Sequence, residues 1–474
     1  KIGLSKNFTV DATLNTDFAQ AEADNRFFNY TRFNIFLPEK RQFFLEANDY
    51  MNFGIPGDFQ LFNSRNIGIE NGNIVPIAAG LRLTGKSKGW QVGALDIQTQ
   101  GIKDANVNPE NFGVVHLHKD LFSNGSYCSG FFSNRLTTVG DSINNKVIAF
   151  DFLHRVNNKW SYGLNVGASK DAAPITRLED HVVFNLLAFR QVSYGYSNFL
   201  TVTKAGANFN PMSGFYADNG FTMAYAFNGY TFKIKNNERL NYFDLSTEVY
   251  YKWNTKNTNG IETGYFNLIS SLSFKNGLLL KNRTTPYSTD LLPYNWQFSE
   301  HITIPTDRYS LIANEFTFES QKNIRILYQA IITTDKFYGG NRIALEPQIN
   351  GAVNKHFALQ MYYLFTQINF PKEFSDNGNG KFRSHLLSTK FIYSFNTQIS
   401  FSTLIQYDNV SKTVGANFRF RFNPVEGTDL YVVYNPSMNT ETTRYIPELP
   451  SVAQQLLIVK FTKTFSIKTS SGKL

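Results

Sequence analysis

The feature that most restricts the fold of this chain is an alternation of apolar and polar side chains, which recurs from about residue 75 to Ile467. Each alternating run is followed by a turn or by a longer polar loop. The clearest run extends from Phe243 to Asn254: the residues at odd positions are mostly apolar and those between them mostly polar. Because side chains of a β-strand point alternately to two faces, such a run has one apolar face and one polar face. The sequence therefore predicts long strands whose apolar faces form a shared surface.

The composition indicates where this apolar surface lies. Aromatic residues make up 16% of the chain, with 45 Phe and 25 Tyr, yet the mean hydropathy is only −0.29. No window approaches the roughly 18 to 20 uninterrupted apolar residues that a membrane helix needs. Since a bilayer cannot satisfy free backbone groups, the remaining way to cross it is a closed sheet. The expected fold is all-β, a transmembrane antiparallel β-barrel with apolar residues facing lipid and polar residues facing the lumen.

Short and long connections alternate along the chain. Tight links are expected at 86–89, 123–125, 157–158, 195–197, 236–239, 276–277, 321–323, 354–355 and 396–397. Longer loops are expected at 101–110, 136–145, 170–180, 209–220, 284–310, 372–382 and 436–452. Outer-membrane barrels have short periplasmic turns and long extracellular loops, so the alternation assigns a side to each connection. This alternation predicts about 22 strands, within a range of about 20 to 24. The first strand is expected at Leu4–Asn15 and the last at Gln454–Ile467. An even number of strands places both termini in the periplasm.

One strand changes the parity of its apolar residues. Phe221 to Phe227 are apolar at odd positions, whereas Tyr230 and Phe232 continue the pattern at even positions. A β-bulge at Gly229 would account for this switch, because a bulge inserts one extra residue into a strand.

Residues 16–74 break the period of two and combine many Phe, Arg, Lys and Glu side chains. The chain is therefore interpreted as a single domain, residues 1–474, in which 16–74 form a plug or constriction in the lumen; the alternative is an additional hairpin with an ordered external loop. Lys40, Arg41 and Glu46 are expected to pair with charged groups on the lumen wall. The residues proposed for these contacts are Arg32, Glu39, Lys40, Arg41, Glu46, Glu248, Arg419 and Arg421.

The formal charge is +9, but Lys and Arg are scattered along the chain. Nucleic-acid binding usually concentrates basic residues on one face, so nucleic acid is not an expected partner. Solvated loops and lumen positions account for scattered charges, and basic residues near anionic headgroups are favourable. The expected partners are outer-membrane lipid and lipopolysaccharide.

Few groupings of residues point to chemistry. Cys128 is the only cysteine, so no disulfide or thiolate metal cluster can form within the chain. His116 and His118 lie on one face of a strand without an evident third ligand. Asp17, Glu22 and Asp24 form the densest acidic group but lack the spacing of a calcium loop. Hydrolase, metalloprotease and phosphate-loop motifs are absent from the sequence. No catalytic residue, metal or cofactor is expected.

Both ends of the chain carry recognisable motifs. They are Leu14 to Asp24, Thr31 to Phe33, Pro38 to Arg41 and Phe43 to Glu46 at one end, and Tyr393 to Phe395, Leu404 to Tyr407, Asn417 to Arg421 and Gly427 to Asn435 at the other. Together they resemble a family of uncharacterised Bacteroidota outer-membrane β-barrel proteins. Members of that family usually carry an N-terminal domain similar to family-9 carbohydrate-binding modules, and the present sequence contains only the barrel part. The resemblance implies an outer-membrane location and, elsewhere in such proteins, binding of a saccharide.

The leading functional hypothesis is a non-catalytic outer-membrane barrel that acts as a membrane anchor or scaffold. It would be a subunit of a larger envelope complex or the carrier of a soluble N-terminal domain, with other envelope proteins as partners. An alternative is a diffusion or uptake channel for saccharides, because a barrel of about 22 strands has a wide lumen. A second alternative is the barrel part of a surface carbohydrate-active enzyme.

Overall fold

A computed structural model describes most of the chain. The described residues are 1–16, 26, 28–33, 35–46, 48–55, 59–70, 73–139, 143–157, 159–255, 260–321, 324–425 and 427–463. Among them, no helix has both the length and the apolar character needed to cross a bilayer. The helices are short: α1 (Gln42–Leu45), α2 (Asn48–Met51) and 3-10 turns at Ser64–Asn66, Lys103–Ala105, Leu178–His181 and Lys372–Phe374.

One antiparallel sheet of 24 strands dominates the described structure. Its strands are β1 (Ile2–Gly3), β2 (Phe8–Thr16), β7 (Ile77–Ser87), β8 (Trp90–Thr99), β9 (Glu110–Leu121), β10 (Ser126–Thr137), β11 (Asn144–Val156), β12 (Trp160–Lys170), β13 (Val182–Arg190), β14 (Gly195–Ala205), β16 (Phe221–Lys233), β17 (Leu240–Asn254), β18 (Ile261–Phe274), β19 (Leu279–Leu292), β22 (Asp307–Ser310), β23 (Ala313–Glu319), β24 (Ile326–Phe337), β25 (Gly340–Ala352), β26 (Phe357–Asn369), β27 (Lys381–Ser394), β28 (Ile399–Asp408), β29 (Thr413–Val425), β30 (Thr428–Asn439) and β31 (Val452–Lys463). The prediction of an all-β fold built on one large antiparallel sheet is confirmed.

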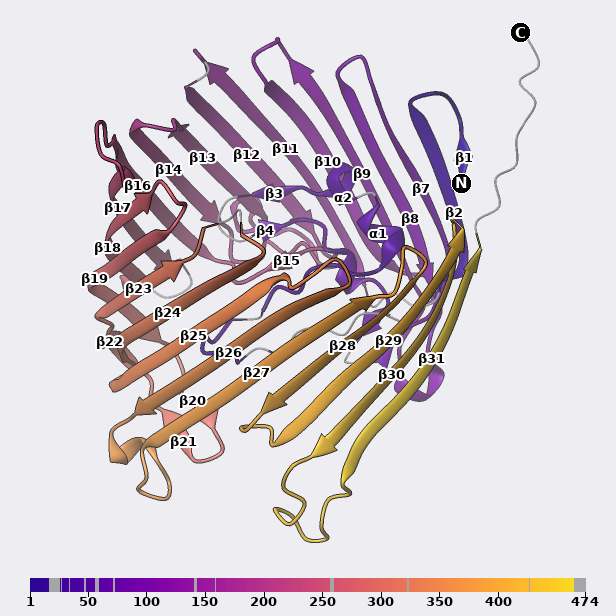
Figure 1. Cartoon of the computed structure of the whole chain (residues 1–474). Helices are drawn as coiled ribbons and strands as arrows, with labels where there is room; N and C mark the ends of the chain where they lie inside the picture. The colour runs from indigo at the N-terminus through magenta and orange to yellow at the C-terminus, as the bar shows by residue number, and fades with distance from the viewer. Residues whose placement is uncertain are drawn as a thin grey trace.

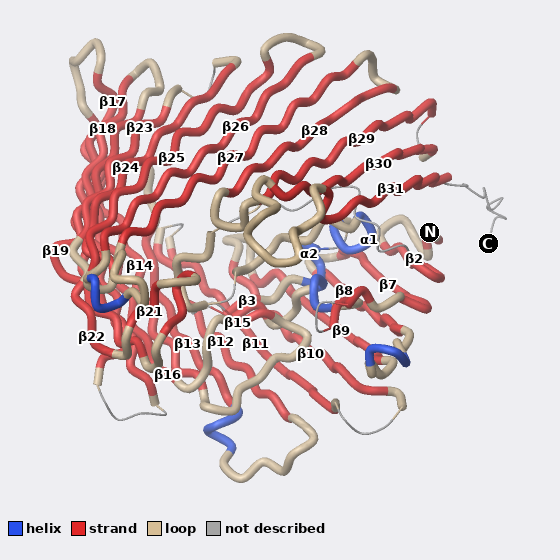
Figure 2. The backbone as a smooth tube through the Cα atoms, turned by 90° about the horizontal axis from the view of Figure 1, so that it is seen from below, coloured by secondary structure: helices blue, strands red, loops and turns tan. Residues whose placement is uncertain are grey.

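Each strand pairs with its neighbours in sequence, and the sheet curls around (Figure 1). β1 is only two residues long, and β22 and β23 lie one after the other along β19, so the sheet has 22 full strand positions. Its two ends, β2 and β31, come near each other in both views (Figures 1 and 2). No strand pairing joins them within the described residues, so the sheet is strongly curved but open rather than closed.

The two faces of the sheet differ as the alternation predicts. On β17, Leu245 and Trp253 are exposed on the convex face, whereas Ser246 and Lys252 are buried on the concave face. β12 follows the same rule, because Tyr162 is exposed while Ser161 and its inward neighbours are buried. The convex face is therefore apolar, and the polar side chains of the same strands point into the curve of the sheet.

Most short connections lie where the sequence predicts them, although the one expected at 195–197 lies at 191–194 instead, because β14 begins at Gly195. The long loop expected at 284–310 is wrong. β19 continues to Leu292, and a small hairpin of β20 (Trp296–Ser299) and β21 (Ile302–Ile304) precedes β22. This stretch contains Pro286, which lacks a backbone N–H. The strand absorbs it in a bulge: Phe266 pairs with Tyr287 and Leu268 with Thr284, which leaves two residues of β19 opposite one of β18.

The bulge predicted at Gly229 is also wrong. β16 keeps an uninterrupted register with β14 and with β17 through Gly229. Phe221 and Met223 lie on the concave face, where they are buried, while Tyr230 and Phe232 lie on the convex face and are exposed. Near Phe221 the apolar residues of β16 point to the concave face, and near Phe232 they point to the convex face. The change occurs because an apolar segment packs against the concave face at the Phe221 end of the strand.

Candidate functional site

That packing partner is the segment formed by residues 26–74, of which the described parts lie inside the curve of the sheet (Figures 1 and 2). The segment contains α1, α2 and two pairs of very short strands: β3 (Gly54–Ile55) with β4 (Phe59–Gln60), and β5 (Ile69–Glu70) with β6 (Asn73–Ile74). We call it the inner segment. Its side chains contact the concave face of the sheet rather than lying outside it.

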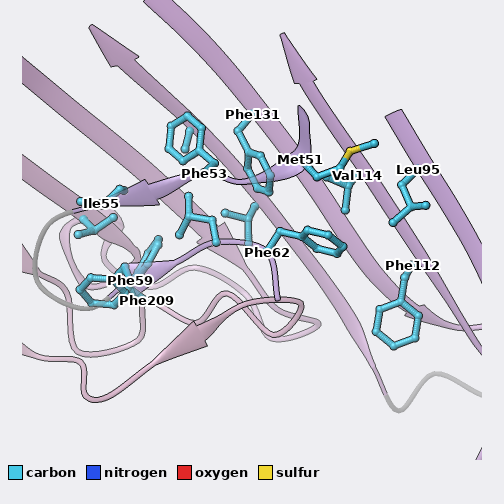
Figure 3. Close-up of a cluster of buried hydrophobic side chains, with 14 of the residues drawn as sticks. Met51, Phe53, Ile55, Phe59, Phe62, Leu95, Phe112, Val114, Phe131 and Phe209 are labelled. Atoms are coloured by element: carbon cyan, nitrogen blue, oxygen red, sulfur yellow. The ribbon is translucent and has the colours of Figure 1, made fainter. Parts of the chain in front are cut away.

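An apolar core joins the inner segment to one half of the sheet. Figure 3 shows Met51, Phe53 and Phe62 of the inner segment close to inward side chains of β8, β9 and β10. The wall residues in this core include Leu95, Phe112, Val114 and Phe131, and those of the inner segment also include Ile55, Phe59, Leu61 and Ile67. Burial of this many apolar side chains is the main favourable contribution to docking.

The long connection between β14 and β16 folds into the same core. Its strand β15 (Phe215–Tyr216) pairs with β4, which also pairs with β3, so a three-stranded sheet forms inside the larger one. Phe59, with 1% of its surface exposed, stacks against Tyr216 and Phe221. Gly214 allows the close approach, since a Cβ there would collide with the carbonyl oxygen of Gln60.

A buried cluster of charges ties the inner segment to the sheet at a second place. Arg32 lies 2.5 Å from a carboxylate oxygen of Glu262 on β18 and 3.8 Å from Asp290 on β19. Lys252 on β17 contacts Asp218 at 2.7 Å and Glu262 at 3.7 Å. The side chains of Arg32, Glu262 and Asp290 are each at most 8% exposed. Buried charges are tolerated only when they are paired with opposite charges. This cluster therefore fixes one position of the inner segment against the sheet.

A third contact lies beside the first strand of the sheet. Arg82 on β7 bonds Asp11 on β2 at 2.5 Å and also contacts Glu46 of the inner segment at 3.2 Å. Its guanidinium also donates to the carbonyl oxygen of Phe43. Glu46 pairs in addition with Lys1. The start of the chain and the inner segment therefore share one arginine.

Within the inner segment, Glu39 and Arg41 form a buried ion pair with 2.7 Å between Arg41 Nη2 and Glu39 Oε2. Glu39 accepts a further hydrogen bond from the Ser64 hydroxyl at 2.6 Å, and Arg41 donates to the carbonyl oxygen of Ile67 at 2.8 Å. Burial alone would raise the pKa of Glu39, but the hydrogen bonds and charge of Arg41 outweigh it, so the pKa lies below its ordinary value. This pair connects the residues before α1 to the turn at Ser64–Asn66.

The other half of the sheet borders a polar cavity, and a second, smaller apolar core lies where the β20–β21 hairpin packs against the ends of its strands. The cavity has a volume of about 390 Å³ and lies between Lys40 of the inner segment and the inward side chains of β25 to β29. Its polar lining residues are Lys40, Gln348, Asn350, Gln360, Tyr362, Ser388, Lys390, Ser402, Asn417 and Arg419. Amides, hydroxyls and three cationic side chains together form a surface suited to hydroxyl-rich or anionic small molecules.

The structure brings only some of the residues predicted to join the inner segment to the sheet into contact with each other. Lys40 and Arg419 line the same cavity, and Arg32, Glu39, Arg41 and Glu46 make the contacts described above. Glu46 pairs with a charged group of the sheet, Arg82 on β7, as expected. Arg41 instead pairs with Glu39 inside the inner segment. Glu248 lies 3.6 Å from Arg283 and Arg421 lies 2.8 Å from Asp429, so both have partners on the sheet itself.

Several functional anchors escaped the sequence analysis, namely Arg82, Glu110, Arg135 and Glu262. Arg135 on β10 binds Glu110 on β9 at 2.9 Å and reaches Glu70 of the inner segment at 2.6 Å. In the sequence, these four residues could be identified only as members of the polar face of alternating strands. A polar face carries both solvated and buried charges, so the pattern does not distinguish them. Only the three-dimensional register identifies their partners.

The histidine and acidic groups do not assemble a metal site in the part of the chain that the structure describes. His116 lies on the concave face, where its Nδ1 donates to the carbonyl oxygen of Tyr50 at 2.9 Å. His118 contacts Asp120 at 3.2 Å. Asp17, Glu22 and Asp24 lie outside the described residues.

Residues 1–78 match the model of a family described as a domain of unknown function (DUF5916). The match covers β1, β2 and the whole inner segment, and it ends just after β7 begins. No curated protein matches the chain. The similarity therefore concerns the first strand of the large sheet together with the segment that packs inside it.

We expect Arg32→Met to lower the free energy of unfolding by about 3 to 5 kcal/mol, because it leaves Glu262 buried without its main partner. The double variant Arg32→Met/Glu262→Gln should recover most of this loss. Urea titration measures both. Arg177→Met, which breaks an exposed pair with Glu179, serves as the control and should leave the free energy of unfolding nearly unchanged. An Arg32 variant as mild as the control would contradict the buried-pair assignment.

We expect the Glu39 pair to make docking of the inner segment sensitive to acid. The folded-state pKa of Glu39 is lowered, so its contribution is present above the ordinary value of 4.5 and is lost as the pH falls through the lower folded-state pKa. Proteolysis of the inner segment, measured from pH 7 downward, should accelerate in this range. Glu39→Gln should be less protected at pH 7 and should show a smaller acceleration than the parent. Equal acceleration in both proteins would show that other carboxylates control docking.

Proposed function

We propose that this chain is an outer-membrane β-barrel that acts as a membrane anchor or scaffold, with the inner segment as a fixed plug in its lumen. The observation that carries the proposal is the exposed apolar convex face. Large apolar side chains point outward on neighbouring strands all around the sheet, for example Ile148 with 64% and Leu186 with 50% of their surface exposed. Soluble monomers rarely expose so large a continuous apolar surface, whereas a membrane barrel requires it.

The same proposal accounts for the two edges of the sheet. With 22 positions, β2 and β31 run antiparallel to each other and can pair directly. Unpaired backbone groups at these edges would be costly in hydrocarbon, so we propose that β31 pairs with β2 in the membrane and closes the barrel. The short turns and both termini would then face the periplasm, and the long loops would face outside.

A fixed plug favours a scaffold over a freely open pore. The inner segment combines an apolar core with buried ion pairs to β7, β10, β18 and β19. Each of these contacts would have to be broken before the inner segment could leave the lumen. The chain would then present its loops or an attached domain to other envelope proteins, as a subunit of a larger complex.

The polar cavity favours a second candidate, a diffusion or uptake channel. It leaves space between the inner segment and β25 to β29, and its amides and hydroxyls could line a path for saccharides. The third candidate, the barrel part of a surface carbohydrate-active enzyme, rests on the family resemblance alone.

We expect Leu186→Arg to reduce assembly into the outer membrane or to destabilise the assembled protein by about 2 to 4 kcal/mol, which is the cost of a cation at a lipid-facing position near the bilayer centre. Leu178→Arg is the matched control, because Leu178 is 64% exposed but lies in a long connection. Membrane fractionation and heat-modifiable gel mobility measure assembly. If both variants behave like the parent, or if the parent dissolves without detergent, the membrane proposal is wrong.

Conductance in planar bilayers separates the scaffold from the channel. The scaffold predicts no steady conductance from the purified chain, because the proposed plug, held by an apolar core and buried ion pairs, would block the ion path. The channel predicts steady conductance that decreases when the cavity is narrowed by Ser402→Trp. Conductance insensitive to this substitution would place the ion path elsewhere.

A further inference from the structure

An apolar groove crosses the convex face over β9 to β13. It has a volume of about 530 Å³, and its outward side chains include Val115, Leu117, Phe132, Ile148 and Phe150. All five are exposed. The groove is thus a depression in the surface that the proposed function places against lipid.

The groove exists because Gly130 has no side chain. By strand register, Gly130 lies between Leu117 on β9 and Phe150 on β11. A Cβ added at Gly130 would meet no other atom within 4 Å, so it would project into the empty groove. A larger residue here would fill the groove without displacing a neighbour.

A pair of lysines lies at one end of the groove. Ile148 and Ala168 are paired across β11 and β12 and both line the groove. The next pair on the same face, toward the long loops, is Lys146 and Lys170, and both side chains are exposed. Lys204, near the end of β14, is exposed on the same face.

Lysines directly opposite each other on one face of a sheet repel, because their Cβ atoms are only about 4.5 to 5.5 Å apart. Each ammonium carries three donors and no acceptor. A phosphate between the two lysines would accept hydrogen bonds from both and offset the repulsion. The adjoining groove is apolar, and its lining residues Ile148 and Ala168 lie two positions along their strands from the lysine pair.

We propose that this surface is a binding site for a phosphorylated lipid, with the phosphate between Lys146 and Lys170 and an acyl chain along the groove over Gly130. The site rests on the proposed membrane location. The lysine pair lies at the long-loop end of the strands, so the lipid would belong to the outward-facing leaflet.

Binding of phosphatidylglycerol to the delipidated full chain, followed by native mass spectrometry, tests the site. Lys146→Gln/Lys170→Gln should weaken binding by about 30-fold, since each lysine near an anionic lipid contributes roughly fivefold. Gly130→Leu should also weaken binding, although it leaves every charge in place. Lys275→Gln/Lys355→Gln removes two exposed lysines from short turns at the opposite end and should change binding less than twofold. Circular dichroism checks that each variant is folded.

Phosphatidylcholine of the same chain length and inorganic phosphate complete the comparison. The proposal expects weaker binding of both, because phosphatidylcholine has no net negative charge and phosphate has no chain for the groove. It is overturned if inorganic phosphate binds as tightly as the lipid, if Gly130→Leu has no effect, or if the control pair matters equally. A chain that fractionates with the membrane but fails this test contradicts only the lipid site, whereas a chain that is soluble without detergent contradicts the proposed function itself.

Discussion

The separation of side chains by the two-residue period of a β-strand is the constraint on which the rest of this structure depends. It holds only if the strands keep their register with one another, because a slip of one residue would exchange the two faces. From β9 to β16 the pairings are uninterrupted, so inward positions on neighbouring strands meet at the same level. The apolar convex face and the polar concave face both follow from this continuity.

The concave face is not uniform, and its composition reflects what packs on it. Where the apolar core of the inner segment packs, inward positions include Phe112, Phe131 and Phe221. Charged inward residues such as Arg82 and Arg135 pair with carboxylates of the inner segment. Where the polar cavity lies, inward positions carry amides, hydroxyls and cations. Gly93 illustrates the fit at the boundary, since a Cβ there would collide with the backbone of Tyr50 in α2. Sheet and inner segment are therefore complementary in both chemistry and shape.

The family match has a structural meaning even without a known activity. It joins β2, one edge of the large sheet, with the inner segment, and these two parts meet at Arg82 and Glu46. The matched residues form one physical unit: an edge strand and the segment that packs inside the sheet next to it. Arg82 contacts both parts of this unit.

The sequence by itself determined the all-β class, the antiparallel order of the strands and the two faces of runs such as 243–254, because these depend on local period and on turn residues. It also identified 16–74 as different from the rest. Its predictions of a loop at 284–310 and of a bulge at Gly229 were wrong, because the structure at both places depends on neighbouring strands and on the inner segment rather than on local sequence. Only the tertiary structure decided the partners of Arg32, Glu46 and Arg82 and the place of the polar cavity, because such contacts join residues far apart in the chain and depend on three-dimensional register rather than on spacing in sequence.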